Sequence, residues 1–287
     1  MYGERPAGAG LAGAVLWTSV RDRPGQPGRV LPDGCMDLIW SSTGGLLVAG
    51  PDTTAELVDG PAGEWHVGLR FAPGTGPAVF GVPAEELRDQ RVPLAALWSA
   101  APVRDLADRV AAAAGPGTPA VPAVAGPTAP TAPTDPTGPT GPAPAAGGTA
   151  GPADSCAAGP GAVGALLVEV AVGRLRAAGG PDPVAALVAR RMAAGDPVPA
   201  VAAELGLGER QLHRRSRHLF GYGPKTLARI LRLRRALALA YAGMPAAEVA
   251  ARAGYADQPH LSREVRSLAG VPLGALTGGT TRRPTGR

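Results

Sequence analysis

Two short segments in the C-terminal third of the chain follow the same pattern, and this repetition constrains the fold more than any other feature. Residues 204–214 (ELGLGERQLHR) and residues 252–263 (RAGYADQPHLSR) each lead from a small apolar helix through a Gly turn into a helix that carries Leu-x-Arg. The leucine of each second helix must face inward, so the arginine two positions later faces solvent. The pattern therefore predicts two helix-turn-helix units, each with a basic outer face that suits a groove of DNA.

Charge is distributed unevenly along the chain. Residues 181–287 contain 17 Arg or Lys against 7 Asp or Glu, a balance of +10, whereas residues 1–180 contain 11 against 16, a balance of −5. A basic segment next to an acidic one indicates that the basic segment meets a polyanion. This asymmetry agrees with the DNA-binding interpretation of the two units.

Composition divides the chain into regions. Residues 113–162 consist almost wholly of Pro, Ala, Gly and Thr, and such a segment lacks the apolar side chains that would offset its ordering entropy. We therefore expect a disordered linker here, preceded by a sensor or dimerisation domain over residues 1–112. We expect a connecting helix over residues 163–180, a DNA-binding domain over residues 181–278 and a disordered tail over residues 279–287.

The first region has the pattern of strands followed by short helices. Apolar and other residues alternate over Val67–Phe71, and short apolar runs follow turn-forming residues at Met36–Trp40 and Leu46–Val48. Residues 84–90 and residues 102–113 have helical spacing. We therefore predict an α+β N-terminal domain that is β-rich with short helices.

The last region is helical in pattern, which predicts an all-α C-terminal domain. Apolar residues recur at i, i+3, i+4 and i+7 over Val198–Leu205 and Ala246–Ala253, and these helices would support the two Gly turns. Between the units, residues 224–241 predict a connecting helix roughly 25 Å long. A rigid helix of this length suits two recognition helices that enter major-groove faces about one duplex turn, roughly 34 Å, apart.

Residues 183–276 resemble the DNA-binding domain of the AraC/XylS family of transcription regulators. The resemblance is carried by both Gly turns, by the connecting helix that follows residues 221–224 (GYGP), and by residues 253–263 (AGYADQPHLSR) with residues 270–272 (GVP) after them. It implies a sequence-specific transcription regulator whose two recognition helices occupy successive faces of the major groove. The partners it suggests are double-stranded DNA, RNA polymerase, an unidentified small-molecule effector and a second copy of the chain.

The exposed positions of the two recognition helices supply the expected DNA contacts. These are Arg210, His213, Arg214, Arg217, Gln258, His260, Ser262, Arg263 and Arg266. The resemblance assigns base reading to Arg210 and Arg214 in the first helix. In the second helix it assigns base reading to Gln258 and Arg263. Arg suits guanine and Gln suits adenine, because each makes paired hydrogen bonds to that base edge. We expect His213, Arg217, Ser262 and Arg266 to contact phosphates, which position the protein without specifying sequence.

The chain departs from the family pattern at a few positions. Ser216 and Val265 occupy sites where many relatives carry a bulky aromatic residue, so we expect both units to be packed less tightly. Gly208 is a poorer helix cap than the usual Ser. Pro259 lies in the first turn of its helix, where a missing N–H is tolerated.

The first region carries a fainter resemblance, to the N-terminal part of one group of AraC-like regulators. It rests on residues 30–40 (VLPDGCMDLIW), residues 68–71 (GLRF) and residues 80–87 (FGVPAEEL). In such proteins this part is taken as a sensing or dimerising domain. Asp33, Cys35 and Asp37 alternate along one predicted strand and would share a face.

Two interpretations of that triplet remain open at this point. A Cys with carboxylates suits a metal or thiol sensor. The plainer alternative is a turn Asp, a buried Cys and a second Asp that holds a backbone group.

Enzymatic function is not expected, and neither is a cofactor or a bound metal. The chain has only four His residues, two of which fall on the expected DNA face, and it lacks a Gly-rich phosphate loop and a nucleophile elbow. Two alternatives to sequence-specific regulation are a non-specific architectural DNA-binding protein and a DNA-repair or thiol-sensor fusion that uses Cys35. The repair alternative would need a zinc-binding cysteine set, whereas the chain has two cysteines in all.

We expect the protein to be cytoplasmic and to have no membrane partner. No apolar run approaches the roughly 18 residues of a membrane span. The mildly apolar segment Ala7–Trp17 is interrupted by Gly and lacks a convincing cleavage site, so it does not predict a signal peptide. Cys35 and Cys156 lie far apart and form no disulfide framework, which fits a reducing compartment.

Overall fold

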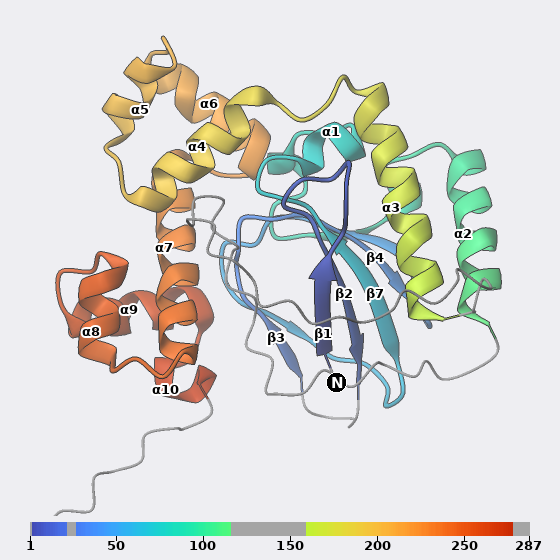
Figure 1. The fold of residues 1–287 in the computed structure, drawn as a ribbon, viewed down its shortest axis with the longest axis horizontal. Coiled ribbons are helices and arrows are strands. Elements are labelled where there is room, and N and C mark those ends of the chain that lie inside the picture. Colours follow the sequence, from blue (N-terminus) through green and yellow to red (C-terminus); the bar gives the residue numbers. More distant parts are fainter. Residues whose placement is uncertain (1, 22–26, 116–158, 278–287) are drawn as a thin grey trace, which may run out of the picture.

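The computed structural model describes residues 2–21, 27–115 and 159–277. Most of the predicted linker (residues 113–162) and all of the predicted tail (residues 279–287) lie outside the described residues. A sheet covered by helices forms one side of the molecule, and a column of helices forms the other (Figure 1).

The N-terminal domain is built on antiparallel strands. The main sheet has the order β1-β2-β7-β4-β5-β8, and β3 and β6 form a second, two-stranded sheet. The strands are β1 (Tyr2–Pro6), β2 (Val15–Val20), β3 (Gly28–Val30), β4 (Asp37–Ser41), β5 (Gly45–Ala49), β6 (Glu56–Val58), β7 (Trp65–Arg70) and β8 (Arg91–Pro93). The predicted strands at 36–40, 46–48 and 67–71 correspond to β4, β5 and β7. Strands β1, β2, β3, β6 and β8 were not predicted. The last three are only three residues long, too short for an alternating pattern to show.

Helical segments follow and flank these strands. They are α1 (Gly76–Phe80), the 3-10 turns η1 (Ala84–Glu86) and η2 (Leu94–Ala96), α2 (Ala100–Ala114) and α3 (Pro160–Ala177). The predicted helix over residues 84–90 is only the single turn η1. It ends early because Asp89 takes a left-handed φ of 57° and the chain enters β8 at Arg91. No helix in the described part of the chain is both long enough and apolar enough to cross a bilayer.

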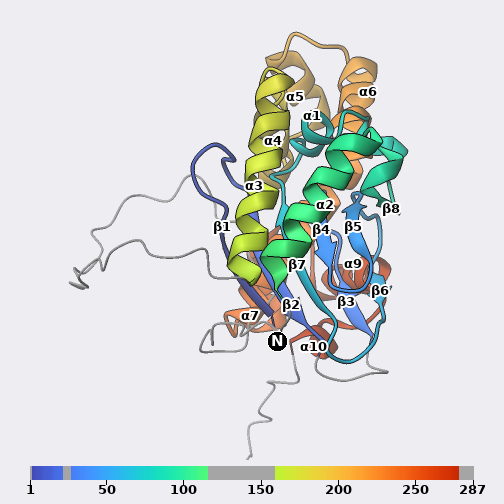
Figure 2. The same cartoon turned by 90° about the vertical axis from the view of Figure 1, so that its right-hand side faces the viewer.

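One face of the main sheet is apolar and is covered by α2 and α3. Leu38, Val67 and Leu69 are at most 1% exposed, and they share one core with Leu167 of α3. Alternate residues of each strand point to the same face, and α2 and α3 lie across the sheet (Figure 2). Helix α3, which the sequence predicted only as a connecting helix, therefore also forms part of the N-terminal core.

Helix α3 lies close to the sheet because a glycine faces it. A Cβ at Gly164 would lie 3.3 Å from the Leu16 side chain of β2, and Val163 and Leu167 are fully buried on the same side of α3. Residues far apart in the sequence, across the predicted linker, thus form one hydrophobic core.

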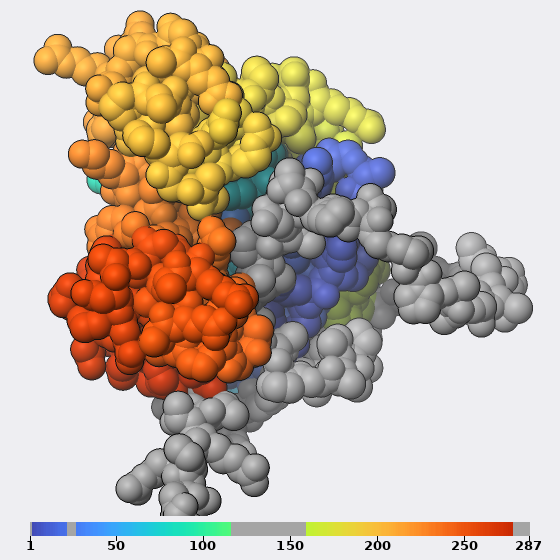
Figure 3. Space-filling model, turned by 60° about the vertical axis from the view of Figure 1, so that its left-hand side comes forward, coloured from blue at the N-terminus to red at the C-terminus, as the bar shows by residue number. Residues whose placement is uncertain are grey.

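The C-terminal domain is all-α, as the sequence predicted. Its helices are α4 (Pro183–Ala194), α5 (Val198–Glu204), α6 (Glu209–Phe220), α7 (Pro224–Tyr241), α8 (Ala246–Ala253), α9 (Gln258–Ala269) and α10 (Leu273–Leu276). Helix α7 joins two compact units, and Figure 3 shows them one beside the other along a single face of the molecule.

Each unit has its own hydrophobic core, and α7 contributes to both. Leu227 and Ile230 of α7 pack with the α4–α6 unit, whereas Leu233 and Leu237 pack with the α8–α10 unit. The buried apolar residues of α7 are therefore divided between the two units, with the first half of the helix packing in one core and the second half in the other. This arrangement fixes the two units relative to each other.

Replacement of Leu167 by Ala tests the role of α3 in the N-terminal core. We expect a loss of about 2–5 kcal/mol in the unfolding free energy, because the side chain is fully buried and leaves a cavity. All four tryptophans lie between residues 17 and 98, so the fluorescence of a denaturant titration reports this domain selectively. The matched control is Leu166→Ala, on the half-buried side of the same helix. Equal losses in the two variants would contradict the packing described here.

Candidate nucleic-acid interface

The two Gly turns close in the same way. Gly206 and Gly254 have φ values of 64° and 84°, a left-handed conformation that L side chains rarely adopt. After each glycine the next residue donates its backbone N–H to a carbonyl five residues earlier, Leu207 to Ala202 and Tyr255 to Ala250, both at 2.9 Å. Two supporting helices thus end in the same motif, and each leads into a recognition helix.

The second turn is one residue longer than the first, and this residue changes the cap of the following helix. In the second unit the Asp257 carboxylate accepts the His260 backbone N–H at 2.6 Å and caps α9. In the first unit Gly208 has no side chain to offer, and the Gln211 side chain instead accepts the Gly208 N–H at 2.8 Å. In both units a side-chain hydrogen bond defines the first residue of the recognition helix, but only α9 has a side chain that acts as its N-cap.

Helix α6 presents its predicted contact residues on one exposed face. Leu212 and Leu219 face inward, and a buried Ser216 lies between them. The predicted residues Arg210, His213, Arg214 and Arg217 are all exposed. Their spacing of three, four and seven residues places them on the same side of the helix.

Helix α9 has a similar but less basic face. Leu261 and Val265 point inward, Gln258, Arg263 and Arg266 are exposed, and Ser262 is half-buried. If Leu261 is matched to Leu212, then Arg263 matches Arg214 and Arg266 matches Arg217. The residue that matches Arg210 is Pro259, which cannot read a base. The second helix therefore presents one candidate arginine reader fewer than the first, and its other candidate reader is Gln258, next to Pro259.

His260 is held by its own turn. Its Nδ1 accepts the Ala256 backbone N–H at 3.3 Å, and its ring lies edge-on against Tyr255 with ring centroids 5.2 Å apart. These contacts support the helix start, so His260 is less free to meet DNA than the arginines of the same helix.

The two positions where many relatives carry a bulky aromatic residue are closed to solvent. Ser216 is 1% exposed and its hydroxyl donates to the Tyr222 carbonyl at 2.9 Å, while Val265 is fully buried. The small polar residue at 216 thereby ties α6 to the loop that leads into α7.

The sequence analysis missed an ion-pair cluster that joins α9 to α7. Glu264 is 7% exposed, and its carboxylate accepts hydrogen bonds from Arg229 at 3.2 Å and from Arg232 at 2.9 Å. The Arg232 guanidinium also lies 4.8 Å from the Tyr255 ring centroid, in a cation–π contact. Burial alone would lower the pKa of Arg232, but hydrogen bonding to Glu264 raises it. An acid at an inward position of α9, between Leu261 and Val265, was the signal in the sequence.

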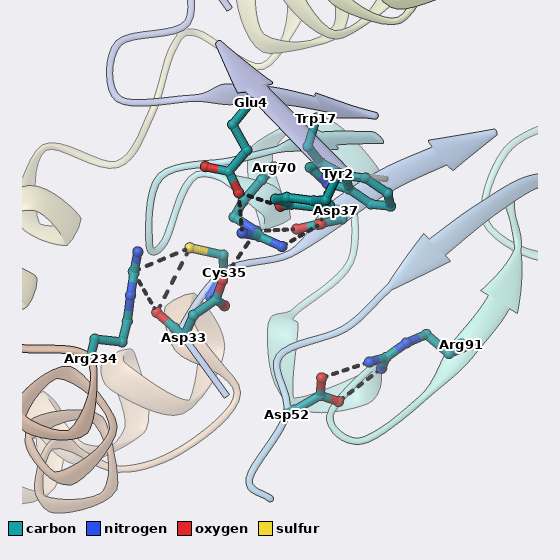
Figure 4. Close-up of polar contacts among 10 residues, drawn as sticks. All are labelled: Tyr2, Glu4, Trp17, Asp33, Cys35, Asp37, Asp52, Arg70, Arg91 and Arg234. Carbon is teal, nitrogen blue, oxygen red and sulfur yellow. Dashed lines mark hydrogen bonds and ion pairs between the residues drawn. The ribbon is translucent and has the colours of Figure 1, made fainter. Parts of the chain in front are cut away.

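The triplet Asp33, Cys35 and Asp37 does not lie along one strand, contrary to prediction. Strand β4 begins at Asp37, and the other two residues form a turn before it, in which the Asp33 carboxylate accepts the Cys35 backbone N–H at 2.9 Å. Asp37 holds side chains instead of a backbone group, because it accepts from Trp17 at 2.8 Å and pairs with Arg70 at 3.3 Å. Figure 4 shows Arg70 at the centre of this group.

Arg70 favours the ionised forms of Asp33 and Asp37, against the effect of burial. It also pairs with Asp33 at 3.1 Å and with Glu4 at 3.6 Å. Burial opposes ionisation of Asp33, but Arg70 and Arg234 outweigh it and lower the Asp33 pKa. Burial, together with the negative charge of Asp33, raises the pKa of Asp37 despite Arg70. No group of three or more His, Cys, Asp or Glu residues within the described ranges could hold a metal ion.

The Asp33–Cys35 turn is also where the two domains meet. Arg234 of α7 donates to the Asp33 carbonyl at 2.9 Å and lies 3.8 Å from the Cys35 sulfur (Figure 4). Gly34 has a φ of 82°, and a Cβ there would lie 3.5 Å from Leu227 and 3.6 Å from the Tyr222 hydroxyl. The N-terminal domain therefore contacts the helix that both recognition units share.

The second contact between the domains involves α6. Helix α6 packs on η1, and Arg88 of the N-terminal domain donates to the Gly221 carbonyl at 3.3 Å. A cleft of about 500 Å³ opens beside this contact, lined by Thr53, Arg88, Asp89, His213, Arg217, Tyr222, Gly223 and Thr226. Two predicted phosphate contacts, His213 and Arg217, thus face the N-terminal domain.

These features together define a DNA-binding protein with two helix-turn-helix units on one shared helix. Residues 201–277 match the model of a helix-turn-helix domain family, and residues 14–93 match that of a domain of unknown function, DUF6597. The chain therefore carries an AraC-type helix-turn-helix domain at its C-terminal end and a DUF6597 domain at its N-terminal end, and the first of these supports a DNA-binding transcription regulator.

The matches to solved structures are distant in both sequence and structure. ToxT from Vibrio cholerae, solved at 1.65 Å, is 10% identical with a TM-score of 0.44, and the match covers 93% of this chain and 99% of ToxT. The C-terminal domain of AraT, a response regulator from Geobacillus stearothermophilus, is 19% identical with a TM-score of 0.32, over 37% of this chain and 93% of that domain. No curated protein matches the chain.

Replacement of Glu264 by Gln tests the cluster that fixes α9 on α7. We expect a loss of about 1–3 kcal/mol in the unfolding free energy of the C-terminal domain, because two arginines lose a largely buried carboxylate partner. Helix content, followed by circular dichroism in a denaturant titration, measures it. The matched control is Glu248→Gln, which removes an exposed pair with Arg252 and is expected to cost under about 0.5 kcal/mol. A loss no larger than that of the control would show that the cluster does not fix α9.

The reactivity of Cys35 distinguishes a structural thiol from a thiol sensor. Cys35 is 7% exposed, and burial together with the Asp33 charge raises the pKa of its thiol. Because the thiolate is the nucleophile, we expect iodoacetamide to modify Cys35 far more slowly in the native protein at neutral pH than in denaturant. The measurement is mass spectrometry on a Cys156→Ser chain. A native rate close to the denatured rate would support the thiol-sensor alternative.

Proposed function

We propose that this regulator binds specific DNA sequences through both recognition helices, with α6 and α9 in successive faces of the major groove. The observation that carries the proposal is that α7 packs into the cores of both units. At 18 residues, this helix is roughly 27 Å long. Two units held at its ends suit two groove faces about one duplex turn apart.

Base reading is proposed for the exposed arginines of the two helices and for Gln258. Arg210, Arg214 and Arg263 have exposed guanidinium groups suited to guanine, and Gln258 has an exposed amide suited to adenine. His213, Arg217, Ser262 and Arg266 are proposed to contact phosphates. The presence of side chains suited to base edges in both units favours specific recognition over a purely architectural role.

A regulatory role is proposed for the N-terminal domain, through an effector or through pairing with a second copy. The support is its direct contact with α6 and α7, made by Arg88 and by the Asp33–Cys35 turn. A conformational change in the N-terminal domain would alter these contacts and so affect the position of α6 and α7.

The central experiment is a gel-shift assay on the DNA upstream of the protein's own coding sequence, with competitor DNA present. Specific regulation requires tighter binding to this DNA than to a scrambled duplex of equal length and composition. Equal affinity for the two duplexes would favour the architectural alternative.

Replacement of Arg263 by Ala tests base reading by the second unit. We expect specific binding to weaken by about 1–3 kcal/mol, and selectivity among operator variants to relax, because a paired contact to one base is lost. The control is Arg104→Ala, which removes the same charge from the exposed side of α2. Unchanged selectivity in Arg263→Ala would show that the second unit does not read this base.

A further inference from the structure

One residue of the DNA-facing side of α6 is already bound by the N-terminal domain. The Arg217 guanidinium lies 2.5 Å from a carboxylate oxygen of Glu85, which belongs to η1. The Arg217 side chain is 50% exposed and that of Glu85 is 28% exposed, so the pair lies at the edge of the domain contact. Arg217 shares its helix face with Arg210 and Arg214, so the carboxylate is placed beside the groups proposed to meet DNA.

The carboxylate is held there by packing. Ala84, next to Glu85, is fully buried, and a Cβ at Gly221 would lie 2.5 Å from Pro51 and 3.3 Å from the Ala84 carbonyl. Gly221 itself has a φ of 84°, so this close approach needs glycine at the end of α6. The position of Glu85 relative to α6 is thus fixed by the close approach of Gly221 to the Pro51 ring and to the Ala84 backbone.

The N-terminal domain makes a different kind of contact with the second unit. Arg266, which matches Arg217, has no ion pair in the part of the chain that the structure describes. The N-terminal domain brings a cation to this end of α9, because Arg29 donates to the Ala269 carbonyl at 2.8 Å. A cation at a helix C-terminus is favourable for the helix and does not repel phosphate. The domain contact therefore opposes DNA at the first unit only.

A carboxylate at this place has two effects on an approaching duplex. It competes with a phosphate for the Arg217 guanidinium, and it repels the phosphate by its own charge. Each phosphate that a protein neutralises releases counterions, and this makes affinity depend on salt. While Glu85 holds Arg217, one such contact is lost from the first unit.

The geometry points to Glu85 as a determinant of DNA affinity, an autoinhibitory residue that withholds Arg217 from DNA while the domains are in contact. This inference rests on the proposed function, since it requires that Arg217 meets a phosphate. Any change that separates η1 from α6 frees Arg217, and the first unit then gains one contact while the second unit is unaffected.

The test compares the unaltered protein with four full-length variants on a duplex recovered from a random-sequence pool by selection on the unaltered protein. The variants are Glu85→Gln, Arg217→Ala, the double variant, and the control Glu86→Gln. Glu86 is the next residue of η1, is exposed and forms no ion pair in the described part of the chain, so its replacement changes the net charge equally. Binding is measured over a series of salt concentrations, and thermal unfolding checks that each variant folds.

Glu85→Gln is expected to bind DNA about five-fold more tightly, the size of one partly exposed ion pair. Its plot of log affinity against log salt is expected to steepen by about 0.9, which corresponds to one more phosphate contact. Glu86→Gln is expected to change the DNA affinity and the salt slope much less than Glu85→Gln does. The double variant is expected to bind no better than Arg217→Ala.

The outcomes separate the inference from the function on which it rests. Equal affinities and equal salt slopes for Glu85→Gln and Glu86→Gln would overturn the autoinhibitory role, and so would a gain that persists without Arg217. If selection recovers no preferred duplex, the proposed sequence-specific function is overturned, and salt slopes on the unselected pool still decide the role of Glu85.

Discussion

Helix α7 is the constraint on which the C-terminal domain depends. Its first half contributes Leu227 and Ile230 to one core and its second half contributes Leu233 and Leu237 to the other, so neither unit can rotate without breaking buried contacts. Because close-packed cores deform little, the two recognition helices keep a set distance and orientation. The buried Glu264 of α9 forms ion pairs with Arg229 and Arg232 of α7, and these pairs also connect the two helices.

The N-terminal domain is built against the same helix. Its sheet buries apolar residues under α2 and α3, while the turn at Asp33–Cys35 contacts Arg234 of α7. The polar cluster around Arg70 holds this turn in place, since that guanidinium pairs with both Asp33 and Asp37. The contact between the domains is therefore supported by a fixed charge network and not by loop residues alone.

The two units are alike in backbone and different in their surroundings. Both turns close with the same left-handed glycine and the same hydrogen bond, yet the second contains an extra residue that supplies the Asp257 cap. The first unit meets an acidic residue of the N-terminal domain at Arg217, and the second meets a basic one at Ala269. A repeated motif thus gives two surfaces of different charge.

The sequence by itself determined the two helix-turn-helix units, the helix between them and the outward direction of Arg210, Arg214 and Arg263. These features follow from local spacing, since an inward leucine fixes where its neighbours on the same helix point. Only the tertiary structure decided the pairing of Arg217 with Glu85, the burial of Glu264 between two arginines, and the packing of α3 on the sheet. Each of these joins residues far apart in the chain, and periodicity along a sequence carries no information about such partners.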